Sequence, residues 1–125
     1  VLVVDDDEGV RVIMTRVLET RHEVVAEASG EGARARLAAD RRFDAIFCDL
    51  MMPGTSGMDL HAWLADEDPS LAGRVVFVTG GTFTARAAAY VARVPNRRID
   101  KPFTASSLLD LADEIVAAAR AREPE

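Results

Sequence analysis

Residues 43–57, FDAIFCDLMMPGTSG, decide the fold. The first six of them put apolar side chains on both faces of an extended strand, and the run then stops abruptly in Pro53 and Gly54. Apolar residues on both faces are typical of a parallel strand in a sheet that helices cover on both sides. The sequence therefore predicts a buried strand that delivers Asp49 to the carboxyl end of a sheet, where such folds place their chemistry.

Length and composition limit the chain to one domain. Its 125 residues are 49% hydrophobic, which is enough for a core of its own. The formal net charge of −6 disfavours direct binding to nucleic acid or contact with an anionic membrane, because both carry negative charge. A basic protein surface or a metal cation is the expected partner.

The single cysteine, Cys48, lies inside the predicted buried strand, so the sequence offers neither a disulfide framework nor a thiol cluster for zinc. This use of cysteine is typical of the reducing cytoplasm, where we expect the protein. No apolar run reaches the roughly 20 residues of a membrane span, and no signal-peptide pattern opens the chain. Because the chain starts on strand-like Val1 without Met, we expect that it was cut from a longer protein.

Strand and helix patterns alternate five times along the chain. The predicted strands are residues 1–4, 23–28, 43–49, 74–79 and 98–100. A helical apolar pattern follows each strand, and the helix after residues 43–57 is expected to stop at Asp68-Pro69, because a residue before proline leaves the α region. Short connections and right-handed crossovers then favour a flavodoxin-like, doubly wound α/β sandwich of five parallel strands in the order 2-1-3-4-5, with five helices.

The last helix completes the predicted domain, residues 1–121. Its apolar positions are Leu108, Leu109, Leu111, Ala112, Ile115 and Val116. They form a stripe wider than one contact needs, which predicts a second contact surface, for a dimer or for a partner protein. Residues 122–125 are polar, and we expect a tail or the start of a linker there.

The predicted strand ends bring five chemically important side chains to one edge of the sheet. They are Asp5, Asp6, Asp49, Thr79 and Lys101. Two like charges about 4 Å apart repel by about 4 kcal/mol at an effective dielectric of about 20, so three clustered carboxylates need protons or a cation. Hard oxygen ligands suit Mg²⁺, which takes a few carboxylates together with water and phosphate oxygens.

With a cation present, Asp49 is a candidate nucleophile toward phosphorus, because a carboxylate can form a covalent acyl phosphate. Lys101 would hold one phosphoryl oxygen, and Thr79 with the Gly80 backbone amide would hold another. Asp6 would bind the metal directly and Asp5 through water. These roles give the edge of the sheet a phosphoryl-transfer chemistry.

The motifs together resemble the receiver domain of two-component response regulators. They are Val1-Leu-Val-Val-Asp5-Asp6, Asp49-Leu-Met-Met-Pro-Gly, Val78-Thr79-Gly80 and Lys101-Pro102-Phe103. In that family an acidic pair, a phospho-accepting Asp, a Ser or Thr and a Lys-Pro stand in this order with similar separations. The resemblance covers essentially the whole chain.

This resemblance implies a phosphoacceptor in a two-component phosphorelay and not a conventional enzyme. A histidine kinase or a phosphotransfer domain would pass the phosphoryl group from its phosphohistidine to Asp49, and the domain would catalyse its own phosphorylation and dephosphorylation. Mg²⁺ would be held by Asp6, Asp49 and the Met51 carbonyl. Asp5 completes the predicted metal site, and Leu50 joins the predicted phosphate-binding residues.

Two further implications concern the strand that ends at Lys101. The Lys101-Pro102 peptide bond is expected to be cis, which proline permits at modest cost. Members of the family commonly carry an aromatic residue three positions before the lysine, whose rotation accompanies a movement of the Thr, and here that position is Arg98. Thr79 and Arg98 are therefore the predicted switch residues, and phosphorylation would give the Thr79 hydroxyl a strong acceptor.

Two other functions compete with this interpretation. A phosphohydrolase with an aspartate nucleophile usually has a second Asp two residues later as general acid, where this chain has Met51. A receiver-like interaction module that no longer takes phosphate is disfavoured by the intact acidic pair, Thr79 and Lys101. The parent architecture stays open between a hybrid sensor kinase, which residues 79–81 and 94–98 resemble, and a stand-alone regulator.

Overall fold

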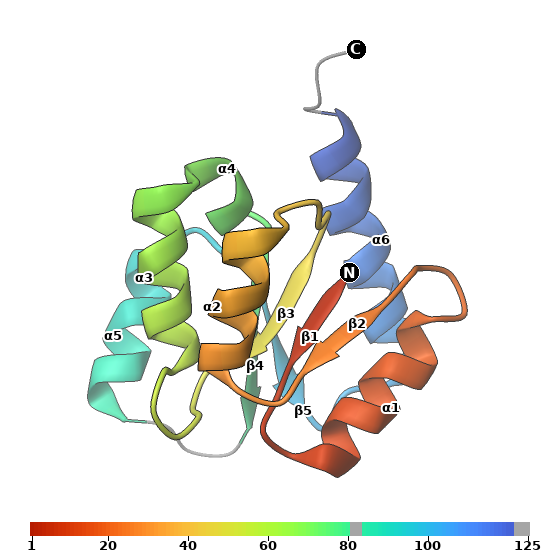
Figure 1. Ribbon diagram of the computed structural model, residues 1–125. Coiled ribbons are helices and arrows are strands. Elements are labelled where there is room, and N and C mark those ends of the chain that lie inside the picture. The colour runs from red at the N-terminus through yellow and green to blue at the C-terminus, as the bar shows by residue number, and fades with distance from the viewer. Residues whose placement is uncertain (81–83, 122–125) are drawn as a thin grey trace.

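Five parallel strands form one sheet in the computed structural model, which describes residues 1–80 and 84–121 (Figure 1). The strands are β1 (Leu2–Val4), β2 (Val25–Glu27), β3 (Ile46–Asp49), β4 (Val75–Gly80) and β5 (Arg98–Lys101). The helices are α1 (Glu8–Leu18), α2 (Gly30–Ala39), α3 (Gly57–Glu67), α4 (Pro69–Ala72), α5 (Ala85–Arg93) and α6 (Ala105–Ala121). A helix follows every strand, as the sequence pattern predicts.

The strand order is β2-β1-β3-β4-β5, and every neighbouring pair is parallel. This order confirms the predicted flavodoxin-like fold. At the centre of the sheet, Val4 of β1 lies opposite Cys48 of β3, and toward the edge strand β5, Thr79 of β4 lies opposite Asp100. Because all strands run in the same direction, their carboxyl ends meet at one edge.

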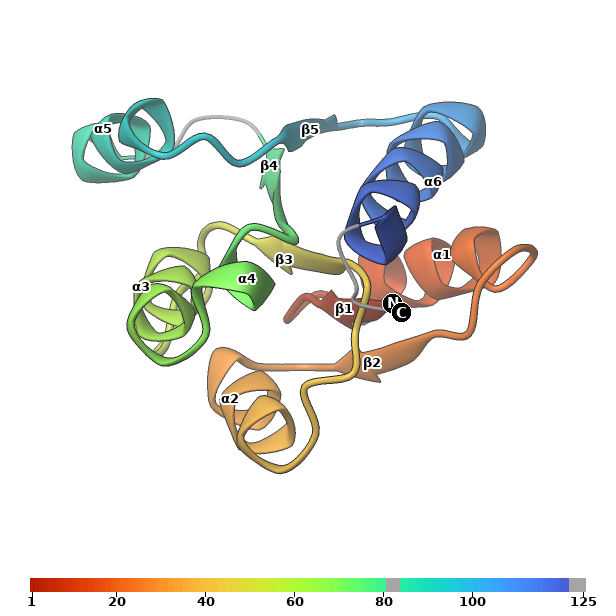
Figure 2. The same ribbon diagram turned by 90° about the horizontal axis from the view of Figure 1, so that it is seen from above.

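Helices cover both faces of this sheet (Figure 2). On one face, α2, α3, α4 and α5 pack around Leu2, Val4 and Phe77. On the other face, α1 and α6 pack around Val3 and Phe47. Successive residues of β1 point into opposite cores, which explains why the strands are apolar on both faces.

The short helix α4 is a feature that the sequence pattern does not predict. α3 ends at Glu67, as expected from the following Asp68-Pro69, but the chain then makes one more helical turn. Asp68 caps this turn by accepting a hydrogen bond from the Leu71 N–H at 3.2 Å, and Pro69 opens it, where no backbone N–H is needed. The described part of the chain therefore has six helices, one more than the predicted five.

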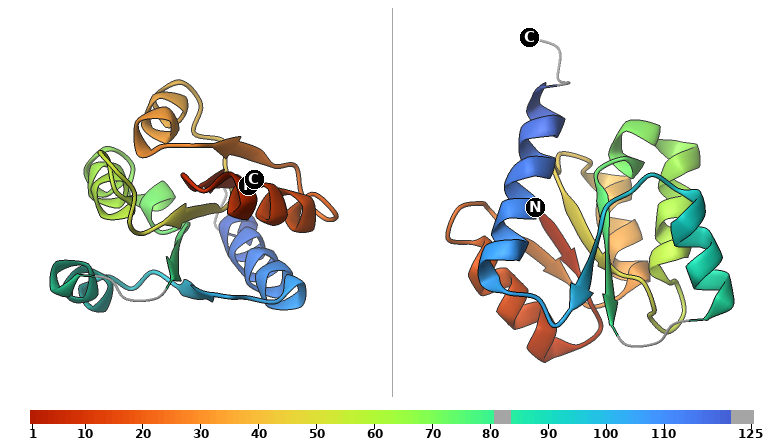
Figure 3. Two further views of the ribbon diagram at one scale, coloured as in Figure 1. Left: turned by 90° about the horizontal axis from the view of Figure 1, so that it is seen from below. Right: turned by 180° about the vertical axis from the view of Figure 1, so that it is seen from behind.

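The wide apolar stripe of α6 is used within the fold. Its buried residues include Leu108, Leu111, Ala112 and Val116, and Leu109 and Ile115 pack half-buried against the same core. α6 lies against both the sheet and α1 and so needs a wider stripe than a helix with one neighbour (Figure 3). The stripe thus has its contacts inside this chain, and it gives no support of its own to the predicted dimer.

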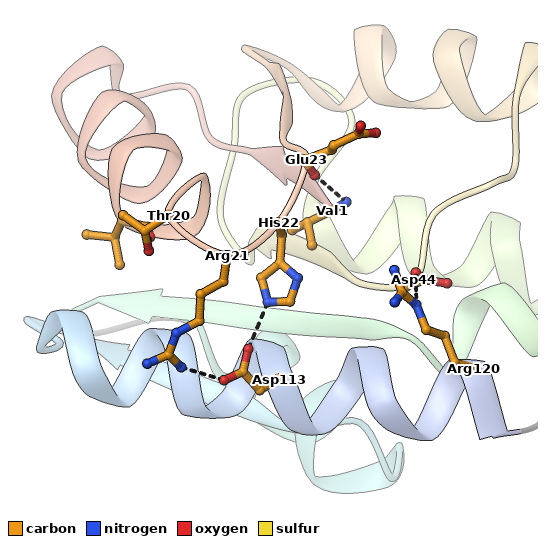
Figure 4. A network of polar contacts seen from close by, with 9 residues as sticks. Val1, Thr20, Arg21, His22, Glu23, Asp44, Asp113 and Arg120 are labelled. Atoms are coloured by element: carbon orange, nitrogen blue, oxygen red, sulfur yellow. Dashed lines mark hydrogen bonds and ion pairs between the residues drawn. The ribbon is translucent and has the colours of Figure 1, made fainter.

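Polar contacts at the opposite edge of the sheet tie α6 to the α1–β2 loop and to the residues just before β3 (Figure 4). Asp113 of α6 pairs with Arg21 at 2.6 Å and with His22 at 2.9 Å. Arg120 of α6 pairs with Asp44 at 3.1 Å. Both arginines have acidic partners, so these contacts join elements of the fold, and they lie away from the predicted site.

Within residues 1–80 and 84–121, no helix combines the length and the apolarity that crossing a bilayer requires. α6 ends at Ala121, the last described residue. The predicted tail, residues 122–125, lies outside the described residues, as do residues 81–83 after β4.

Candidate functional site

Acidic and basic side chains from three strand ends meet at the carboxyl edge of the sheet. Asp5 directly follows β1, Asp49 ends β3 and Lys101 ends β5. The Lys101 Nζ lies 3.1 Å from Asp5 Oδ2 and 3.9 Å from Asp49 Oδ2. One carboxylate oxygen from each of Asp5, Asp6 and Asp49 lies within 4.8 Å of the others. The structure thus brings together the three carboxylates and the lysine that the sequence analysis singles out.

Asp5 is the most buried carboxylate of this cluster, with 1% of its side chain exposed. Its Oδ1 accepts a hydrogen bond from the Asp7 N–H at 2.9 Å, and its Oδ2 accepts one from Lys101 at 3.1 Å. Arg11 donates to its backbone carbonyl at 2.9 Å. Because both carboxylate oxygens already have donors, Asp5 is fixed in place and is less available to a metal than the exposed Asp6.

Asp49 is largely buried, with 13% of its side chain exposed. Burial raises the pKa of its carboxyl to about 6, and the negative charge of Asp5 adds to this increase. Lys101 and a backbone hydrogen bond from Met51 act in the opposite direction. The raised pKa means that Lys101 and Met51 only partly offset the cost of burying the ionised carboxylate beside Asp5, and a cation in the cluster would add positive charge.

The ligand atoms of the cluster fit a hard divalent cation. They are carboxylate oxygens, and Lys101 is the one side chain among the described residues that forms ion pairs with Asp5 and Asp49. Three negative charges against one positive charge leave an excess for a cation to neutralise. Oxygen ligands without sulfur or imidazole are typical of sites for hard ions.

The loop after β3 is held close to the site by backbone contacts. The Gly57 N–H donates to the Leu50 carbonyl at 3.1 Å, and a Cβ at position 57 would lie only 2.5 Å from the Asp49 carbonyl oxygen. This close approach requires glycine. From α2, Glu31 accepts a hydrogen bond from the Thr55 N–H at 2.6 Å. Both contacts fold the loop back, so that its first residues stay beside the site.

Leu50 does not offer the donor that a phosphate-binding role requires. Its N–H donates to the Val78 carbonyl at 3.0 Å within the sheet, and its side chain is buried. The next residue, Met51, is exposed, and its backbone donates a hydrogen bond to the Asp49 carboxylate. Met51 is therefore the loop residue whose amide faces the site.

Thr79 reaches the same edge of the sheet from β4, with 2% of the residue exposed. Its hydroxyl donates a hydrogen bond to Asp100 Oδ1 on the neighbouring strand β5. Gly80 leaves room for Lys101, since a Cβ at position 80 would lie 3.2 Å from the Lys101 Cδ. Sequence reasoning missed Asp100, although its place directly before Lys101 sets it beside Thr79 once the strand register is known.

Arg98, the predicted partner of Thr79 in the switch, is exposed at the start of β5 and lies opposite Phe77. The ring contacts of Phe77 come from α5 and α3 instead, because its ring lies 6.3 Å from that of Tyr90, in an edge-on arrangement, and 5.5 Å from that of His61. The Tyr90 hydroxyl also lies 2.7 Å from His61 Nδ1 of α3. This part of β5 therefore carries a charge where an aromatic residue is common in the resembled family.

Lys101 is the only lysine among the 15 lysine and arginine residues of the chain. Its ammonium is a compact point charge, whereas a guanidinium is a planar fork that needs more space. The side chain is 24% exposed and enters the acidic cluster end-on. The Lys101-Pro102 peptide bond is cis, as the resemblance implies. The one lysine of the chain thus gives the acidic cluster a compact point charge.

The raised pKa of Asp49 predicts how the metal-free protein responds to pH. Protonated Asp49 favours the folded state below the unfolded-state pKa of about 4, and this contribution is lost as the pH rises through about 6. Asp49→Asn should therefore stabilise the metal-free protein by about 1 to 2 kcal/mol at about pH 8 and hardly at all at about pH 4. Urea unfolding with a chelator at both pH values measures this difference. A variant less stable than wild type at the higher pH would contradict the prediction.

Comparison with known proteins gives one family. The response regulator receiver domain family matches residues 1–113. DNA-binding transcriptional regulator NtrC of Azospirillum brasilense is 26% identical over 113 residues, which are 90% of this chain and 23% of that protein. Transcriptional regulatory protein ResD of Bacillus subtilis (strain 168) is 33% identical over 60 residues, which are 48% of this chain and 25% of that protein. The chain thus spans about a quarter of the length of these curated relatives.

Solved structures agree with this result. The receiver domain of NtrX from Brucella abortus matches with a TM-score of 0.80 at 26% identity, over 93% of this chain and 97% of that one. A response regulator receiver domain protein from Clostridium thermocellum has a TM-score of 0.85 at 22% identity, over 98% and 97% of the two chains. The second likeness supports the fold alone, because its identity is low.

Proposed function

Because the chain belongs to the response regulator receiver domain family, we propose that it is a phosphoacceptor switch of a two-component phosphorelay. Asp49 takes the phosphoryl group from the phosphohistidine of a histidine kinase or of a phosphotransfer domain. One observation carries this proposal: the Asp49 carboxylate ends β3 with the Lys101 ammonium at 3.9 Å and two further carboxylates beside it. Such an arrangement suits a nucleophile that will carry an anionic group.

The transfer step is an in-line displacement at phosphorus. A carboxylate oxygen of Asp49 forms the new O–P bond while the N–P bond of the phosphohistidine breaks. The electron pair of the broken bond returns to the imidazole, which takes a proton from water. A pKa of about 6 leaves Asp49 mostly ionised and able to attack at neutral pH. Hydrolysis of the resulting acyl phosphate releases phosphate and restores the carboxylate.

Four groups of the chain would hold the oxygens of the phosphoryl group. The Lys101 ammonium and the Thr79 hydroxyl each donate to one oxygen, and the backbone amides of Gly80 and Met51 complete the set. All four belong to strand ends or to the loop held against β3. Their backbones are therefore in place before the phosphoryl group arrives, which lowers the ordering cost of the transfer. The Thr79 hydroxyl still has to turn from Asp100 to the phosphoryl oxygen.

Mg²⁺ fits the carboxylate cluster, and Asp6, Asp49 and the Met51 carbonyl would hold it. When bound, the ion supplies positive charge that neutralises the group being transferred. Asp5 would act on the ion through water, because its own carboxylate oxygens already have donors. Its ion pair at 3.1 Å keeps Lys101 beside Asp49.

The same geometry disfavours the two competing functions. A phosphohydrolase of this kind needs a general acid two residues after its nucleophile, where this chain has the apolar Met51. A module without phosphate chemistry gains nothing from three carboxylates at one edge, because their mutual repulsion lowers stability.

Phosphoryl uptake from a small acyl phosphate in the presence of Mg²⁺ tests the proposed function. Intact-mass analysis should show a gain of one phosphoryl group per chain. Chelation of the Mg²⁺ before the reaction should prevent this gain. A wild-type protein that gains no mass under conditions that phosphorylate another receiver domain would contradict the proposal.

We place the phosphohistidine partner on an apolar groove beside the site. Its lining residues are Val10, Ile13, Gly80, Lys101, Pro102 and Phe103. Ile13 is 58% exposed, more than any other large apolar side chain of the described residues. A partner that covers this groove would remove Ile13 from water and bring its phosphohistidine to the edge of the sheet.

Ile13→Gln should lower phosphoryl transfer from a phosphotransfer domain about tenfold, because about 1.4 kcal/mol of apolar contact is lost. Uptake from a small acyl phosphate should stay at the wild-type rate. Val12→Gln is the matched control, since Val12 is also exposed on α1 but borders another groove, beside Ala26. Equal losses in both variants, measured by the rate of phosphoryl transfer, would exclude this groove as the docking place.

A further inference from the structure

The Thr79 hydroxyl is engaged before any phosphoryl group arrives. It donates its hydrogen bond to Asp100 Oδ1, and the strand register sets the two residues side by side on β4 and β5. Thr79 is buried, whereas Asp100 is exposed at the edge strand of the sheet. Because a carboxylate is a stronger acceptor than a neutral group, the hydroxyl is held toward β5.

A hydroxyl has a single proton to donate. While Asp100 accepts that hydrogen bond, Thr79 cannot donate to a phosphoryl oxygen on Asp49, which its role in the proposed function requires. Two anionic acceptors on neighbouring strands therefore compete for one donor.

We propose that Asp100 is a positioning residue that holds the Thr79 hydroxyl in the unphosphorylated protein and thereby opposes phosphorylation. The inference rests on the proposed function, since the competition arises only when Asp49 carries a phosphoryl group. Phosphorylation draws the hydroxyl away from Asp100 and releases the Asp100 carboxylate at the edge strand. Thr79 thus passes the change at Asp49 to the surface through Asp100.

Arg98 offers the released carboxylate a cation. Arg98 and Asp100 are two residues apart on β5, so their side chains lie on the same face of the sheet. The register sets them beside Phe77 and Thr79 of β4. A polar exchange, from Thr79–Asp100 to Arg98–Asp100, can therefore take the place of an aromatic rotation in this chain.

A purely structural role for Asp100 would have a different consequence. If its hydrogen bond only ties β5 to β4, removing it lowers the stability of the fold. The affinity of the folded protein for a phosphoryl mimic would then stay the same. Affinity, and not stability, is therefore the quantity to measure.

The test compares the affinities of variants for trifluoroberyllate, a phosphoryl mimic, by calorimetry in Mg²⁺. Asp100→Ala should bind it about 5- to 10-fold more tightly than wild type, because the hydroxyl no longer has to leave a charged acceptor. Asp100→Asn keeps the shape and a weaker, neutral acceptor, and its affinity should fall between the two. In a Thr79→Ala background, Asp100→Ala should change the affinity by less than about twofold.

If Asp100→Ala raises the affinity for the mimic equally with Thr79 and with Ala at position 79, the effect comes from the lost negative charge alone. That result would overturn the proposal. No gain in either Asp100 variant, while wild type binds the mimic, would overturn it and leave the proposed function standing. A wild type that neither binds the mimic nor takes up a phosphoryl group would overturn both. Asp100→Asn keeps the test decisive if Asp100→Ala does not fold.

Discussion

Asp49→Asn is expected to abolish phosphoryl uptake. The amide has nearly the shape of the carboxylate but is not a nucleophile toward phosphorus. After reaction with a small acyl phosphate and Mg²⁺, intact-mass analysis should show one phosphoryl group on wild type and none on the variant. We expect a complete loss, because no neighbouring carboxylate can take the place of Asp49.

Asp5 and Asp6 are the two neighbouring carboxylates that could accept the phosphoryl group in place of Asp49. Asp5 has 1% of its side chain exposed and both oxygens held by donors, so it cannot reach a phosphoryl donor. Asp6 is exposed, but within the described residues Lys101 pairs with Asp5 and Asp49 and not with Asp6. A phosphoryl group on Asp6 would therefore lack the ammonium that stabilises its charge.

Unfolding does not explain the expected loss, because the same substitution should stabilise the metal-free protein at neutral pH. Burial raises the pKa of Asp49, which means that its negative charge is unfavourable in the folded state. Removing that charge should therefore raise the free energy of unfolding. Asp66→Asn is the matched control, since Asp66 is exposed on α3, and it should be phosphorylated like wild type. A phosphoryl group on Asp49→Asn at the wild-type yield would show that another residue accepts it.

The convergence of the site could be predicted because its residues lie at the ends of strands. Asp5, Asp49, Thr79 and Lys101 each come at the end of a strand pattern. The carboxyl ends of parallel strands meet at one edge, whatever the details of side-chain packing. Position along the chain was therefore enough to bring these four residues together without any knowledge of tertiary contacts.

The features that sequence reasoning missed depend on contacts between elements. Asp100 has the pattern of an exposed strand residue, and its contact with Thr79 follows only from the register of β4 and β5. Leu50 stands beside Asp49 in the sequence, yet its N–H is used by the Val78 carbonyl of the neighbouring strand. α4 is a single turn, too short for a periodic apolar pattern.

Lys101→Met is expected to lower both the stability of the metal-free protein and its phosphoryl uptake. Methionine has a similar length without the charge, so Asp5, with 1% of its side chain exposed, loses its charged partner. Breaking a buried ion pair costs about 3 to 5 kcal/mol, and the 24% exposure of Lys101 lowers our expectation to about 2 to 4 kcal/mol. Urea unfolding at neutral pH with a chelator measures this loss. Uptake should fall about 100-fold, because the ammonium no longer reaches a phosphoryl oxygen.

Two comparisons separate the charge of Lys101 from its geometry. Saturating Mg²⁺ should return part of the stability of Lys101→Met, since the ion neutralises the same carboxylates, while phosphoryl uptake stays low. Lys101→Arg keeps the charge but replaces a point charge with a planar fork, so it should keep most of the stability and lose most of the uptake. Phosphoryl uptake by Lys101→Met at the wild-type rate would show that Lys101 does not stabilise the phosphoryl group. If Lys101→Met is as stable as wild type without metal, Asp5 and Asp49 do not need the charge of Lys101.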